Sequence, residues 1–152
     1  QSGGQWNNTH ITQGYSGSES ADNEAVTRQR GGHNSLSITQ YHTSNSTQIT
    51  QDGTVNAATL WQIGNGNSAE ITQTGFNNMS FNFQWWSDNS TIISTQNGKQ
   101  NYARNDQDGS NHSITLYQRG DLNRSDVTQR GYNNAAGTSQ IGTGNVSTIS
   151  QR

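Results

Sequence analysis

The amino-acid sequence is poor in the residues that usually stabilise a small domain. Its 152 residues include no cysteine, which excludes disulfide bonds and thiolate metal sites. Only 21 of them are Leu, Ile, Val or Phe, fewer than an ordinary hydrophobic core needs. Proline is absent and the net charge is only −2, whereas disordered chains are usually rich in proline and strongly charged. Some feature other than a conventional core must therefore order this chain.

Other absences exclude classes of function. The slightly acidic balance of charge argues against a nucleic-acid-binding protein, which would carry a basic stripe. No apolar run approaches the roughly 18 residues of a membrane helix, so we expect no membrane insertion. The chain begins at Gln1 without an apolar signal segment, from which we expect a mature or trimmed secreted chain.

Glutamine recurs with a period of eleven residues. The period is strict from Gln29 to Gln84 and again from Gln96 to Gln151, with one extra residue between the two runs. Five extra residues separate Gln13 from Gln29. Thirteen units result, each closed by one glutamine: Gln13, Gln29, Gln40, Gln51, Gln62, Gln73, Gln84, Gln96, Gln107, Gln118, Gln129, Gln140 and Gln151. Repeats of this kind take precedence over any local reading of secondary structure.

Two further positions of the unit are nearly constant. Asparagine stands six residues before each of these glutamines, or seven before Gln96. These asparagines are Asn7, Asn23, Asn34, Asn45, Asn56, Asn67, Asn78, Asn89, Asn101, Asn123, Asn134 and Asn145, and His112 is the exception. Glycine comes three residues before most of these positions, at Gly4, Gly31, Gly53, Gly64, Gly75, Gly98, Gly109, Gly120, Gly131 and Gly142; Ser20, His42 and Trp86 replace it in the other units. Glycine, Asn, Asp and Ser in this segment supply turns with positive φ.

The residues from each asparagine to the next glutamine alternate between two faces. In residues 67–73, Asn, Ala, Ile and Gln share one face, and Ser, Glu and Thr share the other. A period of two predicts a strand with an inward and an outward face. The inward position two before glutamine is mostly aliphatic, and counting from Asn89 places Ile93 there in the unit with the extra residue. Asn82 and Asn105 fall on this face in neighbouring turns, where we expect them to pair.

The pattern predicts an all-β, two-sheet β-solenoid that forms a single domain over residues 1–152. One unit gives a strand of about six residues and a turn, and two units give a rung of 22 residues. Glutamine and asparagine side chains would hydrogen-bond along columns from rung to rung. Because uncapped solenoid ends present unpaired strand edges, we expect the chain to stack end to end into a cross-β fibre.

At these residues the chain resembles the curlin-repeat subunits of bacterial functional amyloid, known as curli. One copy of the repeat is formed by Asn45, Gln51, Gly53, Asn56, Ala58 and Gln62, and the next runs from Asn56 to Gln73 with the same spacing. The resemblance implies an extracellular fibre of the biofilm matrix that serves adhesion. It also implies a homopolymer, with an export pore, a periplasmic chaperone and a nucleator subunit as partners. The chain is most similar to a major subunit, although the minor nucleator stays an alternative. A curlin usually has a polar export-targeting segment before its repeats, and none is evident after Gln1.

The sequence offers little that points to other chemistry. No catalytic, metal-binding or cofactor-binding constellation stands out from the repeat, so we expect no enzyme activity and no cofactor. The four histidines are expected to have structural or surface roles. A soluble ice-binding or glycan-binding solenoid is a weaker alternative, because the outward threonines do not form an unbroken array.

An aromatic cluster interrupts the repeat near its middle. Phe81 and Phe83 fall on the outward face, followed by Trp85 and Trp86. One interpretation is a local adjustment of register around the extra residue. The others are a lateral contact or adhesive patch between fibres, since exposed apolar patches often mark interaction sites, and a surface on which carbohydrate stacks.

Overall fold

The computed structural model describes residues 6–14 and 22–152, and every regular element within them is a β-strand. Thirteen strands follow one another: β1 (Asn8–Gln13), β2 (Glu24–Gly32), β3 (Ser35–Tyr41), β4 (Ser46–Thr54), β5 (Ala57–Ile63), β6 (Ser68–Phe76), β7 (Met79–Asp88), β8 (Thr91–Lys99), β9 (Tyr102–Ser110), β10 (Ser113–Asp121), β11 (Arg124–Tyr132), β12 (Ala135–Ile141) and β13 (Val146–Gln151). The described ranges contain no helix that could span a membrane.

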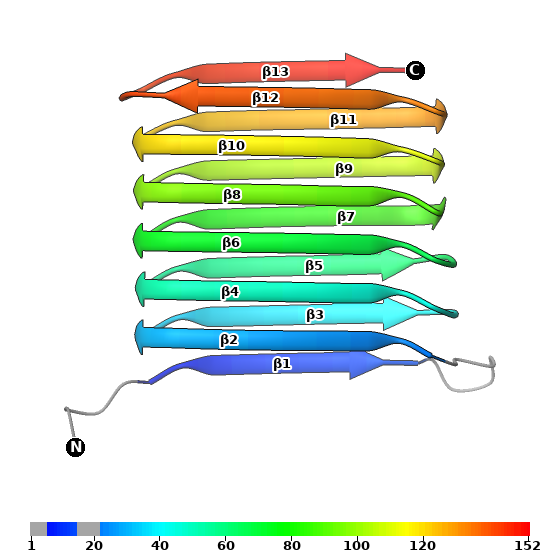
Figure 1. Ribbon diagram of the computed structural model, residues 1–152, viewed down its shortest axis with the longest axis horizontal. Coiled ribbons are helices and arrows are strands. Elements are labelled where there is room, and N and C mark those ends of the chain that lie inside the picture. The colour runs from blue at the N-terminus through cyan, green and yellow to red at the C-terminus, as the bar shows by residue number, and fades with distance from the viewer. Residues whose placement is uncertain (1–5, 15–21) are drawn as a thin grey trace.

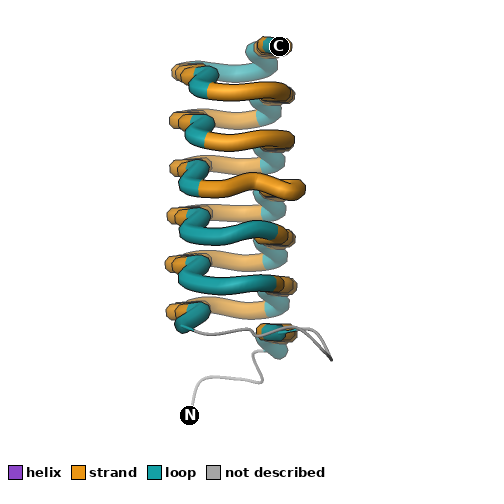
Figure 2. The backbone as a smooth tube through the Cα atoms, turned by 90° about the vertical axis from the view of Figure 1, so that its right-hand side faces the viewer, coloured by secondary structure: helices purple, strands orange, loops and turns teal. Residues whose placement is uncertain are grey.

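The strands coil into a two-sheet β-solenoid, as the repeat predicts. Odd-numbered strands form one parallel sheet of seven strands, and even-numbered strands form a second parallel sheet of six. The chain crosses from one sheet to the other after each strand, so the strands stack in chain order from β1 to β13 (Figure 1). Seen from the side, the two sheets face each other as two thin layers (Figure 2).

Strands of the same sheet pair in the register of the repeat. Ile49 of β4 lies opposite Ile71 of β6, 22 residues later, and Gln51 lies opposite Gln73. The predicted rung of 22 residues is therefore confirmed. Most strands are longer than the predicted six residues, because pairing continues past the glutamine and through the glycine into the turn.

The space between the sheets is filled by small aliphatic and polar side chains. Leu36, Ile38 and Leu60 of the seven-stranded sheet and Ile49 and Ile71 of the other are buried. The glutamines of the repeat from Gln40 to Gln140 and most of its asparagines are buried beside them, whereas Gln13, Gln29 and Gln151 near the ends are partly or fully exposed. A chain with so few aliphatic residues can fold in this way only if its buried amides are hydrogen-bonded.

Each turn from β2 to β13 contains two residues with positive φ. The first is usually the glycine of the repeat, as in Gly53 at 132° and Gly64 at 134°, and is His42 at 73° after β3 and Trp86 at 46° in β7. The second comes directly before the asparagine position and is held by residues of many types: Asp22, His33, Ser44, Val55, Gly66, Asn77, Asn89, Gln100, Asn111, Leu122, Asn133 and Gly144. Because residues as unsuited to this conformation as Val55 occupy it, composition did not reveal the second position.

The extra residue of the repeat forms a bulge near the end of β7. The register between β7 and β9 shifts between Trp85 and Asp88. The β8 strand beyond it pairs without interruption, and Ile92 is buried while Ile93 is 39% exposed. The prediction that placed Ile93 inward is therefore wrong, because the extra residue is accommodated in the bulge and not in the strand that follows.

Candidate functional site

The repeated glutamines form two continuous columns between the sheets. In each column, Nε2 of one glutamine donates to Oε1 of the next, at 2.7 to 3.1 Å. The column of the seven-stranded sheet contains Gln13, Gln40, Gln62, Gln84, Gln107, Gln129 and Gln151. The column of the six-stranded sheet contains Gln29, Gln51, Gln73, Gln96, Gln118 and Gln140.

The same amides also join the two sheets. Gln73 Nε2 donates to Oε1 of Gln96 at 2.9 Å and to the backbone carbonyl of Ala57, in the opposite sheet, at 2.9 Å. An amide nitrogen has two hydrogens, so one serves the column and the other serves the facing strand. Each glutamine thus replaces apolar packing with hydrogen bonds in two directions.

Both columns have a direction. Every link runs from the amide nitrogen of a glutamine to the oxygen of the glutamine that comes later in the chain, as from Gln129 to Gln151. At the β13 end the last amide nitrogens belong to Gln140 and Gln151, and at the β1 end the first oxygens belong to Gln13 and Gln29. One end of each column therefore offers donors and the other offers acceptors.

The asparagines support the turns in a similar way. The backbone N–H of Asn67 donates to Oδ1 of Asn45 at 3.1 Å. Asn45 Nδ2 donates to the carbonyls of Tyr41 at 2.9 Å and Gly64 at 2.8 Å. Equivalent bonds from backbone nitrogen to Oδ1 link Asn7, Asn34, Asn56, Asn78, Asn101, Asn123 and Asn145 on one side of the solenoid, and Asn23, Asn45 and Asn67 on the other.

Two other residue types complete the second asparagine column. Ser90 follows Asn67 and accepts the backbone N–H of His112 through Oγ at 3.0 Å. His112 Nδ1 accepts the N–H of Asn134 at 3.3 Å, and its Nε2 lies 3.2 Å from the carbonyl of Asp108. Asn89, predicted to be a column residue, is instead the exposed turn residue before Ser90. The bulge in β7 shifts the asparagine position by one.

The turn glycines stand where the chain passes closest to the next rung. A Cβ added to Gly53 would collide with the carbonyl oxygen of Gly75, and one added to Gly75 would collide with that of Gly98. The predicted turn glycines from Gly31 to Gly142 all have positive φ. The sequence predicts Trp86 at the glycine position of its unit, but the residue that lies against Gly64 in the next rung is Ser87. Gly4 and Ser20 lie outside the described residues.

Both ends of the described solenoid present unpaired strand edges. β12 pairs only with β10 and β13 only with β11 at one end, and β1 pairs only with β3 and β2 only with β4 at the other. Such edges carry backbone N–H and C=O groups that can bind another strand. Together with the directional glutamine columns, they form the candidate site.

The aromatic cluster lies on the outer face of the seven-stranded sheet. Phe83 stacks with Trp85 at 6.1 Å between ring centroids, and Trp85 contacts Trp61 at 5.2 Å. Phe81 packs beside Tyr102, whose ring also lies 4.6 Å from the guanidinium carbon of Arg124. Both phenylalanines lie on the outward face, as predicted. The predicted adjustment of register is present as the bulge, and a role of the cluster between fibres remains a prediction.

The periodic columns are also where the comparison with known proteins finds a match. Residues 43–75 match the family model of the curlin associated repeat. The match spans β4, β5 and nearly all of β6, about a fifth of the chain. Comparison with curated proteins and with solved structures gave no match. The described residues contain no group of three or more His, Asp or Glu side chains that could hold a metal ion.

Proposed function

We propose that this chain is a curlin subunit that polymerises end to end into an extracellular amyloid fibre of the bacterial biofilm matrix, where it serves adhesion. The observation that carries the proposal is that open strand edges and the ends of the directional glutamine columns occur together at both ends of the solenoid. Donors of Gln140 and Gln151 stand at one end, and acceptors of Gln13 and Gln29 stand at the other. The two ends of identical subunits are therefore complementary.

Growth at such an end needs no new nucleus. An incoming chain docks its first strands on the edges of β12 and β13, and each further rung then forms on the one before it. Backbone bonds, the glutamine links and the glycine contacts repeat the pattern found inside the subunit. The role is structural and requires no catalytic group. Export through an outer-membrane pore, a periplasmic chaperone and a nucleator subunit complete the proposal, by analogy with the curlin family.

Seeded growth tests this function. The chain is purified in denaturant and diluted into buffer, and thioflavin fluorescence is followed with and without fragmented fibres, with electron microscopy at the end point. We expect unbranched fibres and loss of the lag phase when seeds are added. A stable β-rich monomer that never elongates, even with seeds, contradicts the proposal and favours a soluble binding solenoid.

The same assay distinguishes a major subunit from a nucleator. A major subunit polymerises in bulk and elongates its own seeds. If a trace of this chain instead abolishes the lag phase of a second curlin while being incorporated only at fibre ends, the nucleator is the correct assignment.

A further inference from the structure

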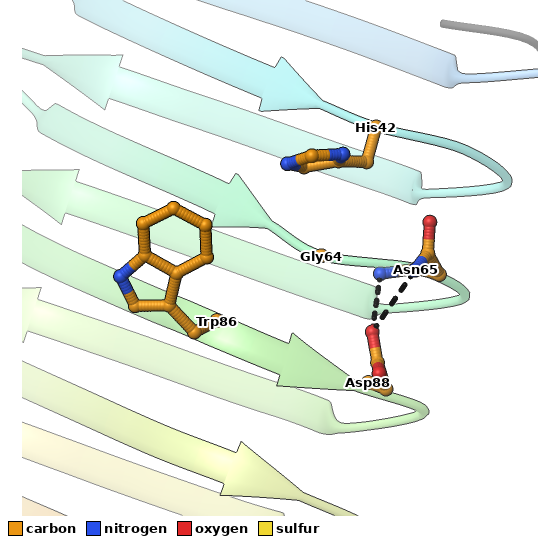
Figure 3. Close-up of a pocket in the computed structure, with 5 residues that line it drawn as sticks. All are labelled: His42, Gly64, Asn65, Trp86 and Asp88. Carbon is orange, nitrogen blue, oxygen red and sulfur yellow. Dashed lines mark hydrogen bonds between the residues drawn. The ribbon is translucent and has the colours of Figure 1, made fainter. Parts of the chain in front are cut away.

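A small pocket lies beside the bulge, where β3, β5 and β7 reach their carboxyl ends (Figure 3). Its volume is about 190 Å³, and its lining residues are His42, Gly64, Asn65, Trp86 and Asp88. They lie at the end of β7 and in the turns that follow its neighbours β3 and β5 in the same sheet, so the pocket depends on the stacking of rungs. The glutamine columns do not use any of these side chains.

Trp86 stands at this pocket because of the extra residue in the repeat. It belongs to the bulge, has a φ of 46° and is 72% exposed. Positive φ is common in the turns of this solenoid, also at Val55 and Leu122, so the feature that sets Trp86 apart is its place in the bulge. Bulges redirect single side chains at functional sites. The glutamine column continues unbroken past the bulge from Gln84 to Gln107, so the extra residue has no role in the ladder.

Polar groups on the other side of the pocket are fixed by hydrogen bonds between turns. Asp88 Oδ1 accepts from the backbone nitrogen of Asn65 at 2.8 Å and from its Nδ2 at 3.3 Å. Asn65 Oδ1 in turn accepts from the backbone nitrogen and the hydroxyl of Thr43, at 3.3 and 2.8 Å. A carboxylate has lone pairs on two oxygens, so Asp88 retains acceptor capacity for a ligand.

These groups suit a polyhydroxylated ring. The face of the Trp86 indole is apolar and carries partial negative charge, so it attracts the weakly positive C–H face of a pyranose. The carboxylate of Asp88 accepts from sugar hydroxyls, and the His42 ring, centred 6.4 Å from the indole, can donate or accept. Among the described residues no lysine or arginine lines the pocket, so an anionic sugar has no such cation to pair with. We propose that this pocket binds one neutral sugar ring of a glycan.

The proposed polymer would strengthen such binding. A single pocket of this size buries few atoms and should bind one sugar ring weakly. If subunits stack end to end, which rests on the proposed function, each contributes one pocket at the same place on its surface. A fibre would then present many copies to a branched or repetitive glycan and bind by avidity.

Polymer-linked sugars provide the test. Polyacrylamide carrying glucose, galactose, mannose or N-acetylglucosamine is added to the immobilised full-length chain, and bound probe is measured. Trp86→Gly removes the indole and also relieves the positive φ, so this variant should fold. Asp88→Asn retains the acceptor for Asn65 but removes the charge. Trp6→Ala is the matched control, because Trp6 is a 79% exposed tryptophan that precedes β1, away from the pocket.

We expect at least one probe to bind, to be displaced by its free methyl glycoside, and to lose about tenfold or more in affinity with Trp86→Gly but not with Trp6→Ala. Asp88→Asn should weaken the same probe. The proposal is overturned if no probe binds the original chain or if both tryptophan variants bind the probe alike. It is also overturned if choline chloride displaces the probe and the free glycoside does not, because the indole would then be a site for cations and not for sugars. Seeded growth of Trp86→Gly should be normal, so failure of this proposal is distinguishable from failure of the proposed polymerisation.

Discussion

The side-chain nitrogen of Asn105 donates a 2.8 Å hydrogen bond to Oδ1 of Asn82, one rung away, between the two sheets. The two residues interrupt a column that is otherwise aliphatic: Ile11, Ile38, Leu60, Val127 and Ile149. The pairing expected from their neighbouring positions is confirmed. Asn105 Oδ1 nevertheless has no hydrogen-bond partner within the described residues.

The pair therefore predicts strong non-additivity. Asn82→Leu alone leaves Nδ2 of Asn105 buried without its acceptor, beside an Oδ1 that already has no partner, and should lower the free energy of unfolding by about 1–3 kcal/mol. The double variant with Asn105→Leu restores a continuous aliphatic column. Its free energy of unfolding should therefore be close to that of the original chain, or higher. Chemical denaturation of both single variants and the double variant gives the coupling energy. Additive losses would show that the two amides act independently.

A glutamine in the middle of a column should matter more than one at its end. Gln73→Ala removes a link to Gln51, a link to Gln96 and the bond to the opposite sheet, so each of three neighbouring polar groups loses one hydrogen-bond partner. We expect a loss of about 3 kcal/mol or more in the free energy of unfolding. Gln151→Ala, the same substitution at a partly exposed column end, should cost about 1 kcal/mol. Equal losses at the two sites would contradict a cooperative column.

Glycine is required at the turn but not along the strand. Gly53→Ala places a methyl group against the carbonyl of Gly75 at a φ of 132°, so it should lower the free energy of unfolding by about 3 kcal/mol or more and slow seeded growth. Gly137 in β12 is the control, since nothing lies within 4 Å of an added Cβ there. Gly137→Ala should be neutral or slightly stabilising, by about 0.5 kcal/mol. Tolerance of alanine at Gly53 would count against the close contact between rungs.

Asp106 gives the solenoid a dependence on pH. Burial raises the pKa of its carboxyl above the ordinary value of 3.8, while the nearby Arg104 and Arg130 partly oppose that rise. A raised pKa in the folded state means that this group favours folding at low pH and loses that contribution as pH rises through the raised pKa. At neutral pH, Asp106→Asn should therefore be more stable than the original chain, by less than about 1 kcal/mol because the carboxyl is not fully buried, at 21% exposure, and the two arginines offset part of the cost of its charge.

Denaturation midpoints between pH 3 and pH 7 check this sign. The advantage of Asp106→Asn should disappear below about pH 3.8. Arg104→Gln removes the 3.5 Å ion pair that lowers the pKa of Asp106. In that background the difference in stability between the chain with Asp106 and its Asp106→Asn variant should be larger at neutral pH. An unchanged difference in the Arg104→Gln background would mean that the ion pair has no influence.

Much of the architecture follows from the period of the sequence. Spacing of eleven residues between glutamines and alternation within each unit predicted two sheets, the 22-residue rung and the inward columns, because one strand-and-turn unit cannot bury its face without its neighbours. The Gln73 and Ile71 positions lie where the alternation placed them. Periodicity specifies register strongly when one face of every strand is buried.

The irregular positions could not be predicted in the same way. The sequence shows that one residue is inserted between Gln84 and Gln96 but not where it is absorbed. Placing it in the β7 bulge keeps the pairing of β8 with β6 and β10 uninterrupted, whereas counting from Asn89 would have required a bulge within β8. Ser90 then serves as the column residue because a hydroxyl can accept the same backbone N–H. The pocket beside Trp86 exists only as a consequence of that choice.

The number of strands in this chain also predicts how its polymer is arranged. Thirteen strands place β1 and β13 in the same sheet. If the next subunit lay unrotated, its β1 would rest on β13 and one strand position above β12 would stay empty. A half-turn instead seats β1 on β12 and β2 on β13, and every edge is paired. Fibres grown from residues 1–152 should therefore show a rotation of about 180° and a rise of about 31 Å per subunit, from strand spacings of about 4.8 Å.

Helical reconstruction of these fibres by electron cryomicroscopy tests the central claim most directly, namely that subunits join strand on strand. The predicted result is two unbroken sheets across every junction, with the half-turn between subunits. Deleting residues 124–134 removes one unit and leaves twelve strands, so the rotation should then move to near zero while the sheets stay continuous. Sheets that stop at each subunit boundary, or subunits joined through the aromatic face around Phe83, would contradict assembly through the open edges.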